Sequence, residues 1–212
     1  MADDDCDVLV VGAGMAGASV AAHLAQGVRV ILLEMEEQPG YHSTGRSAAL
    51  FSENYGNQTI RALSRASRSF LFAPPADFCA APLVRPRSVL VVGRTGQGAA
   101  LADFTARHAP VLEAVGADDA VALCPVLRRD GLLGGVMDRG AADIEVHELH
   151  HGYLRAFKRR GGVLKTGARV TGLVRGADGW TVETEAGRVR AGVVVNAAGA
   201  WAGELGRMAG AQ

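Results

Sequence analysis

The sequence has few cysteines and no excess of charge of either sign. Its three cysteines, Cys6, Cys79 and Cys124, are too few and too scattered for a disulfide framework, which favours a reducing compartment and predicts a cytoplasmic protein. The 22 Lys and Arg residues balance 22 Asp and Glu residues, so net charge gives no reason to bind nucleic acid. With 49% hydrophobic and 21% charged residues, the composition excludes a disordered chain.

The sequence also lacks a long hydrophobic run. The apolar stretch over 8–22 contains three glycines and is too short to span a bilayer. The N-terminus carries Asp3, Asp4, Asp5 and Asp7, where a signal peptide would carry positive charges. We therefore expect no membrane insertion, while peripheral contact with a membrane electron carrier stays open. The length suits one or two domains with a buried core.

A strand–helix–strand unit is predicted at the N-terminus. Residues 8–11 form a continuous apolar run that is typical of a strand buried on both faces. Residues 15–25 are rich in alanine, predict a helix, and are followed by Gly27, a helix C-terminal signal. Residues 28–33 form a second apolar strand that ends at Glu34. A crossover of this kind makes the two strands parallel, and the fold class is α/β.

The turn of this unit carries the dinucleotide-binding pattern GxGxxG over residues 12–17. Gly12 permits the tight turn, Gly14 lets a pyrophosphate approach the backbone, and Gly17 lets the helix pack closely on the strand. Glu34, at the end of the second strand, can accept hydrogen bonds from ribose hydroxyls, which argues against NADP. The alternative is a glycine-rich packing turn, and the pattern alone does not separate FAD from NAD.

Further elements follow the same kind of reasoning. Helical spacing is found over 60–72, 96–108 and 144–160, and a helix begins near Trp201. Short strands are predicted over 89–92, 163–165, 170–174, 180–184, 188–190 and 193–196. The strands after residue 163 form a β-meander.

Two longer motifs then become specific: HSTGRSAA over 42–49 and VVNAAGAW over 194–201. With the N-terminal unit and the meander, they resemble the FAD-dependent D-amino acid oxidase and dehydrogenase superfamily, and most of all its D-arginine dehydrogenases. Shorter matches extend the resemblance over nearly the whole chain: RAL (61–63), PP (74–75), FC (78–79), PVLRRD (125–130) and GAADI (140–144).

This resemblance implies a Rossmann-like parallel sheet that binds FAD, a β-meander, and part of an inserted α+β substrate domain. The implied domains are 1–85 for FAD binding, 86–140 for part of the substrate domain, and 141–212 for a return to the FAD-binding domain. The C-terminal part of the family fold is absent. That part carries the arginine that clamps the substrate carboxylate.

The resemblance also implies which residues touch the cofactor. Glu34 would hold the adenosine ribose with Met35 beside the adenine, and Val170 would meet the adenine through its backbone. The remaining cofactor-binding residues are Gly12, Ala13, Gly14, Met15, Ala16, Gly17, Ser43, Thr44, Gly45, Arg46, Ser47, Ala48, Ala49, Leu50, Ala197, Ala198, Gly199 and Trp201. From the residues alone, segment 41–49 is no more than a polar loop that leads into a helix.

The implied activity is oxidation of D-amino acids to imino acids by hydride transfer to flavin N5, followed by hydrolysis to 2-oxo acids and ammonia. Tyr55 matches a tyrosine on the family's mobile loop over the substrate. Leu50 and Val89 stand where the D-arginine dehydrogenases carry a histidine and a glutamate. Because a substrate cation needs a carboxylate partner, we expect a preference for apolar over basic side chains. Quinone or oxygen could be the electron acceptor, and no residue is assigned as the catalytic base.

Other functions stay open. A glycine or sarcosine type of flavin amine oxidase would differ mainly in substrate, and an NAD-dependent dehydrogenase would share only the N-terminal unit. A truncated, non-catalytic FAD-binding fragment is the alternative from another class. Residues 147–151 match the zinc-hydrolase pattern HExxH. No further ligand pattern follows, so we expect that helix to be structural and the chain to hold no metal.

Overall fold

The computed structural model describes residues 4–108 and 111–211, which divide into two compact units. The first unit comprises residues 4–47, 75–81 and 146–211, and the second comprises the described residues of 48–74 and 82–145. The sequence predicts that residues up to 85 belong with the first unit. Segments 48–74 and 82–85 instead group with the second unit, where both contribute strands that pair with a shared partner strand.

The first unit is an α/β structure built on a six-stranded, mainly parallel sheet. Its strands are β1 (Asp4–Val11), β2 (Val30–Leu33), β9 (Val163–Lys165), β10 (Val170–Gly176), β11 (Gly179–Thr184) and β12 (Gly187–Asn196). Its helices are α1 (Met15–Leu24), α5 (Val146–Arg159), the 3₁₀-helix η1 (Gly199–Trp201) and α6 (Ala202–Met208). The strand order is β10-β11-β12-β1-β2-β9.

Parallel pairing brings the carboxyl ends of three strands to one edge of this sheet. β1 pairs in parallel with β12 on one side and with β2 on the other. Val11, the last residue of β1, lies opposite Leu33 of β2 and Asn196 of β12. The residues that follow each strand therefore meet at a single edge, where open α/β sheets bind their ligands.

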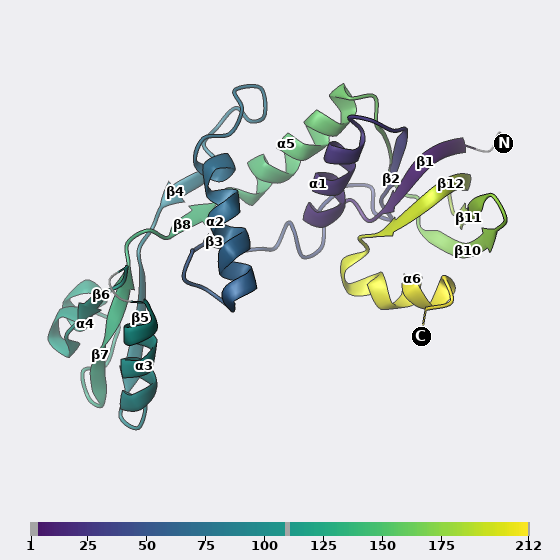
Figure 1. Cartoon of the computed structure of the whole chain (residues 1–212). Helices are drawn as coiled ribbons and strands as arrows, with labels where there is room; N and C mark the ends of the chain where they lie inside the picture. Colours follow the sequence, from purple (N-terminus) through teal and green to yellow (C-terminus); the bar gives the residue numbers. More distant parts are fainter. Residues whose placement is uncertain (1–3, 109–110, 212) are drawn as a thin grey trace. The chain divides into compact units, whose positions relative to one another are not determined.

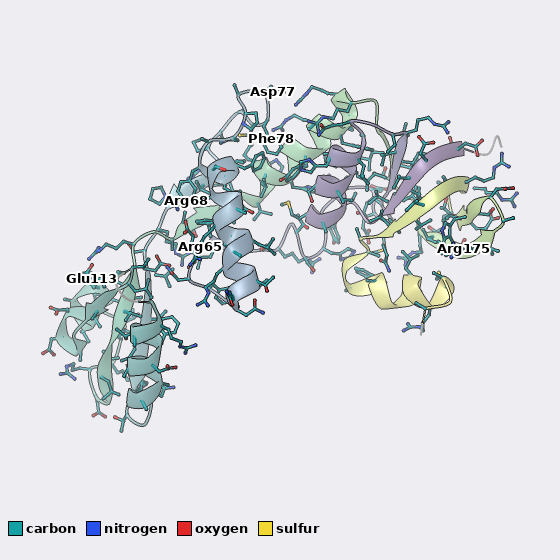
Figure 2. All side chains as sticks on the ribbon, in the orientation of Figure 1. Arg65, Arg68, Asp77, Phe78, Glu113 and Arg175 are labelled. Carbon is teal, nitrogen blue, oxygen red and sulfur yellow. The ribbon has the colours of Figure 1, made fainter. Side chains whose placement is uncertain are left out.

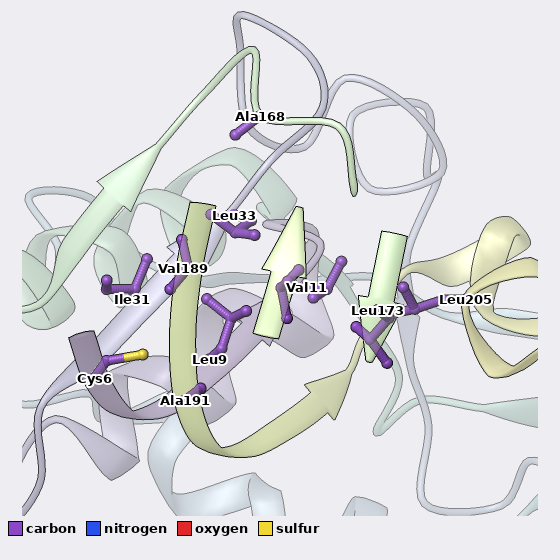
Figure 3. Packing of buried hydrophobic residues seen from close by; sticks show 11 residues of the cluster. Cys6, Leu9, Val11, Ile31, Leu33, Ala168, Leu173, Val189, Ala191 and Leu205 are labelled. Atoms are coloured by element: carbon purple, nitrogen blue, oxygen red, sulfur yellow. The ribbon is translucent and has the colours of Figure 1, made fainter. Parts of the chain in front are cut away.

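The central strands are buried on both faces, as their continuous apolar runs predict. One face carries Leu9 and Val11 of β1 with Ile31 and Leu33 of β2, packed against the meander and α6. Figure 3 shows this cluster, including Leu173 and Leu205. The buried residues of this cluster are Cys6, Leu9, Val11, Ile31, Leu33, Ala168, Leu173, Val182, Val189, Ala191 and Leu205.

The opposite face of the sheet is covered by α1 and α5, which lie side by side (Figure 1). Small residues on α1, among them Ala18, Ala21 and Ala22, are fully buried there with Phe157 of α5. In segment 75–81, Phe78 packs edge-on against Tyr153 of α5, and Asp77 pairs with Arg159 of α5 at 3.0 Å (Figure 2 labels Asp77 and Phe78). These contacts hold segment 75–81 against α5 within the first unit.

The second unit contains two small antiparallel sheets. The first has the order β3-β8-β4, formed by β3 (Leu50–Phe51), β8 (Ala142–Ile144) and β4 (Val84–Pro86). The second has the order β5-β7-β6, formed by β5 (Val89–Arg94), β7 (Leu132–Asp138) and β6 (Glu113–Val115). Its helices are α2 (Gln58–Phe72), α3 (Gly98–His108) and α4 (Ala117–Leu123). On α2, the Arg68 guanidinium lies 4.2 Å from the Phe72 ring centroid (Figure 2 labels Arg68).

One prediction about strands is wrong, and five strands of the second unit (β3, β4, β6, β7 and β8) are not predicted. The pattern predicts separate strands over 188–190 and 193–196, whereas β12 is continuous, because Ala191 pairs with Trp180 of β11 and Cys6 of β1. β7 is not predicted at all, since Gly134 and Gly135 interrupt its apolar run. Among the described residues, no helix combines the length and the apolar character that crossing a membrane requires.

Candidate cofactor site

A cavity lies at the edge of the first unit's sheet where β1, β2 and β12 end. The space between its lining residues is about 870 Å³, part of it open to solvent. Gly12 follows β1, Glu34 follows β2 and Ala197 follows β12, and all three residues line the cavity. The fold therefore joins three segments that are far apart in sequence around one site.

The glycine loop between β1 and α1 has no room for side chains. Gly12 has φ +101°, and a Cβ there would lie 2.4 Å from the Ala197 carbonyl oxygen. A Cβ on Gly17 would lie 1.7 Å from the Gly12 carbonyl oxygen. Both contacts are with backbone atoms, so no side-chain rotation relieves them. The glycines at these positions are required by close packing of the turn on α1 and on the residue after β12.

The N-terminus of α1 presents backbone N–H groups near the cavity. The Met15 N–H donates to the Thr44 hydroxyl at 2.9 Å, and the Ala13 N–H donates to Glu34 Oε2 at 3.0 Å. Within the described part of the chain, the N–H groups of Gly14, Ala16 and Gly17 have no acceptor. Such groups, reinforced by the helix dipole, favour a phosphate oxygen.

Glu34 is a buried carboxylate, 7% exposed, that lines the cavity. It accepts hydrogen bonds from the backbone N–H of Ala13 (3.0 Å) and of Glu36 (3.1 Å). A carboxylate offers about four acceptor positions, so two remain for a ligand's hydroxyl groups. The same side chain thus braces the glycine loop and faces the cavity.

A loop carrying Tyr41, His42 and Thr44 lines another side of the cavity. The His42 ring lies between Tyr41 and Trp201, with ring centroids 5.1 Å and 4.6 Å away, and its Nε2 lies 2.8 Å from Glu36 Oε1. Arg46, one of the residues expected to bind the cofactor, has its guanidinium 5.3 Å from the Tyr41 ring centroid. Trp201 is therefore a wall of the cavity as well as a packing residue.

Eleven of the residues that the sequence singles out for cofactor binding line the cavity. They are Gly12, Gly14, Glu34, Met35, Ser43, Thr44, Val170, Ala197, Ala198, Gly199 and Trp201. Ala13, Met15, Ala16 and Gly17 belong to the loop and α1 without lining it, and Gly45, Arg46 and Ser47 follow Thr44 in the first unit. Ala48, Ala49, Leu50, Tyr55 and Val89 lie in the second unit.

The cavity also includes residues that the sequence analysis did not single out for cofactor binding. They are Val11, Leu33, Gly40, Tyr41, His42, Ala168, Arg169, Ala200, Glu204, Leu205 and Met208. Those that adjoin a predicted residue could have been found by extending each motif by one or two positions. Glu204, Leu205 and Met208 could not, because only the packing of α6 brings them to the cavity.

His150 of α5 contacts the glycine loop and was also missed. It is 3% exposed, and its Nε2 lies 2.8 Å from the carbonyl oxygen of Ala13. Burial lowers its pKa, since a charged imidazole loses its hydration there. It belongs to the HExxH segment but is not one of the two histidines of that pattern, so no sequence pattern pointed to it.

The two histidines of that pattern, His147 and His151, stack with ring centroids 4.1 Å apart. Among residues 4–108 and 111–211, no group of three or more His, Cys, Asp or Glu side chains could hold a metal ion. Contact between the two rings is therefore a structural explanation for the four-residue spacing of these histidines. The absence of a metal from the protein stays a prediction.

These features fit a dinucleotide. The glycine loop provides unpartnered N–H groups for a pyrophosphate, and Glu34 provides free acceptor positions for a ribose. Apolar residues beside them, including Val170 and Leu205, provide a surface for an adenine ring.

Comparison with known proteins agrees with this geometry. Residues 7–212 match the family described as "DAO: FAD dependent oxidoreductase". The chain is 30% identical over 214 residues to mitochondrial dimethylglycine dehydrogenase of Rattus norvegicus, an alignment that covers 98% of this chain and 25% of that protein. The chain therefore spans about a quarter of the length of this relative.

The fold is shared with solved structures of other proteins, among them the following two. Glycine oxidase from Geobacillus kaustophilus superposes with a TM-score of 0.82 at 22% identity, over 98% of this chain and 59% of that one. L-α-glycerophosphate oxidase from Mycoplasma pneumoniae with FAD bound superposes with a TM-score of 0.84 at 15% identity, over 97% and 57%. Both chains are considerably longer than this one.

Proposed function

The chain belongs to the DAO family of FAD-dependent oxidoreductases, whose cofactor is FAD, and we propose that the protein oxidises a carbon–nitrogen bond of a small amino acid. The observation that carries this proposal is the cavity at the ends of β1, β2 and β12. There a buried carboxylate and unpartnered N–H groups stand where a dinucleotide needs them.

Residues of the first unit would hold the cofactor. The N–H groups of Gly14, Ala16 and Gly17 would bind the pyrophosphate, and Glu34 would accept from the ribose hydroxyls. The Thr44 hydroxyl, which accepts from Met15, would keep the loop beside the pyrophosphate. When bound, FAD supplies a hydride acceptor for the carbon next to the substrate nitrogen.

A substrate of the glycine or sarcosine type is the one we favour. A relative at 30% identity is named for dimethylglycine, and one structure of the same fold is named for glycine. These substrates have no large side chain and carry no charge beyond the amino acid group itself. They need no carboxylate for a substrate cation, in keeping with the apolar residues Leu50 and Val89.

Oxidation of D-amino acids with apolar side chains is the second candidate. Leu50 and Val89 favour it over a basic substrate, because a guanidinium left without a partner in an apolar pocket is costly. In this candidate Tyr55, 75% exposed, would serve as the lid over the substrate. The particular resemblance to D-arginine dehydrogenases stays a prediction.

The test is anaerobic addition of substrates to the FAD-loaded protein, with the flavin absorption followed. Glycine, sarcosine, dimethylglycine, D-methionine and D-arginine would be compared at equal concentration. We expect bleaching by at least one N-methylated or unsubstituted glycine and none by D-arginine. Bleaching by D-methionine alone would favour the second candidate, and bleaching by D-arginine above the others would contradict both.

The electron acceptor and the compartment are further parts of the proposal. An oxygen electrode distinguishes an oxidase from a dehydrogenase that delivers its electrons to a quinone. The three cysteines of the chain are free, in keeping with the cytoplasm that their number and spacing predict.

A further inference from the structure

One buried titratable side chain of the first unit is not used by the proposed function. His150 lies on α5, 137 residues after Ala13, and its Nε2 is 2.8 Å from the Ala13 carbonyl oxygen. A carbonyl oxygen can only accept, so Nε2 carries the hydrogen and donates it. Through this hydrogen bond the His150 ring contacts the glycine loop.

The position of the ring is fixed by its neighbours. A Cβ on Gly40 would lie 2.9 Å from Cε1 and 3.1 Å from Nδ1 of His150. The charged and titratable groups around it are His147 and His151 on its own helix and Glu34 at the end of β2. Burial lowers the pKa of His150 and outweighs the hydrogen bond to Ala13 and the attraction of Glu34, which raise it. In the neutral ring that donates through Nε2, Nδ1 needs no acceptor.

Both polar groups of the Ala13 backbone are thereby held by buried side chains. Glu34 Oε2 accepts from its N–H, and His150 donates to its carbonyl oxygen. In a trans peptide the carbonyl and the next N–H point in opposite directions. Fixing the Ala13 oxygen toward His150 therefore directs the Gly14 N–H away from α5. Gly14 lines the cavity.

We propose that His150 is a positioning residue that orients the peptide between Ala13 and Gly14 for the pyrophosphate of the cofactor. This inference rests on the FAD binding of the proposed function and assigns a role to a residue outside the glycine motif. Without the histidine donor, the peptide can rotate and the Gly14 N–H is no longer held toward the ligand. Binding of the pyrophosphate then weakens, while the adenosine end of the site is unchanged.

A pair of amide substitutions tests the role. In His150→Gln the amide nitrogen can reach the place of Nε2, whereas in His150→Asn the same group is too short to reach Ala13. His147→Gln, on the same helix, is the control. Dissociation constants for FAD are measured by flavin fluorescence, and those for adenosine, which lacks the pyrophosphate, by ligand-observed NMR. Thermal melts show whether each variant folds.

We expect His150→Asn to bind FAD about tenfold more weakly, which is the size of one lost hydrogen bond. His150→Gln and His147→Gln are expected to stay within about threefold of the parent chain, and adenosine binding is expected to be the same in all. Nitrogen-15 NMR of the parent chain is expected to show a neutral ring with hydrogen on Nε2.

The inference is overturned if His150→Asn binds FAD as the parent does, or if it loses adenosine as much as FAD. In the second case His150 merely supports the fold. A ring with hydrogen on Nδ1 alone also overturns it. If the parent chain binds no FAD, the proposed function fails and takes this inference with it.

Discussion

Replacing Gly17 with alanine tests how closely α1 packs on the turn that precedes it. The added Cβ would lie 1.7 Å from the Gly12 carbonyl oxygen, whereas real Cβ contacts are essentially never under 3.0 Å. The helix would therefore have to move by more than about 1 Å relative to the turn. Gly12 itself is held by its N–H, which donates to the Leu33 carbonyl oxygen at 2.8 Å.

The cost should exceed that of an ordinary overpacked side chain. Overpacking a core costs about 1–3 kcal/mol when side chains can shift, but here the obstacle is a backbone oxygen. We expect Gly17→Ala to lower the free energy of unfolding of the first unit by about 3 kcal/mol. Because the N-terminus of α1 would move together with the helix, the affinity for FAD should fall at least about tenfold.

Gly27→Ala is the matched control. Gly27 lies just beyond α1, has no positive φ, and a Cβ there has nothing within 4 Å. The free energy of unfolding of the Gly27→Ala variant should stay within about 0.5 kcal/mol of that of the parent chain. Urea unfolding followed by circular dichroism and titration with FAD measure both variants. Equal stability of Gly17→Ala and Gly27→Ala would refute the close packing of α1 on the loop.

Three further predictions follow from buried polar groups. Glu34→Gln should weaken FAD binding about tenfold in a fluorescence titration, because an amide cannot accept from two backbone N–H groups and two ribose hydroxyls together; unchanged affinity would exclude the ribose role. Asp138 accepts from the Ser52 hydroxyl at 2.8 Å and from two further N–H donors, so Asp138→Ala should destabilise the second unit by about 2–3 kcal/mol and speed chymotryptic cleavage at Tyr55. Unchanged cleavage would show that the segment before Tyr55 is held by other contacts. The pKa of His150 is lowered from its ordinary value of 6.5, so below about pH 6.5 the unfolded chain takes up a proton that the folded chain does not. The free energy of unfolding should therefore fall as the pH drops below about 6.5. In thermal melts at pH 7.5 and 5.5, the melting temperature of His150→Gln should fall less than that of the parent chain.

Local patterns predicted most of the first unit. The strand, the helix and the acidic residue of the N-terminal unit are set by apolar runs and glycine spacing, and β1, α1 and β2 begin and end within a few residues of the predicted ranges. The α/β fold with a mainly parallel sheet is confirmed, and FAD is the cofactor of the family.

Pairings between distant residues were not predictable in this way. β7 carries Gly134 at φ +124°, which resembles a turn in sequence, and a Cβ on Gly135 would lie 2.4 Å from the Val91 carbonyl oxygen. Only the neighbouring strand β5 explains that glycine. His150 was missed for the same reason, because the apolar stripe of α5 accounts for the helix and its partner Ala13 is far away in the chain.

A titration of the purified chain with FAD and, in parallel, with FMN tests the central claim most directly. The residues that line the cavity would bind the adenosine and the pyrophosphate, and FMN lacks the adenosine and one of the two phosphates. The account predicts saturable binding of one FAD per chain and at least about a hundredfold weaker binding of FMN. Equal affinity for FMN, or no saturable binding of FAD, would contradict it.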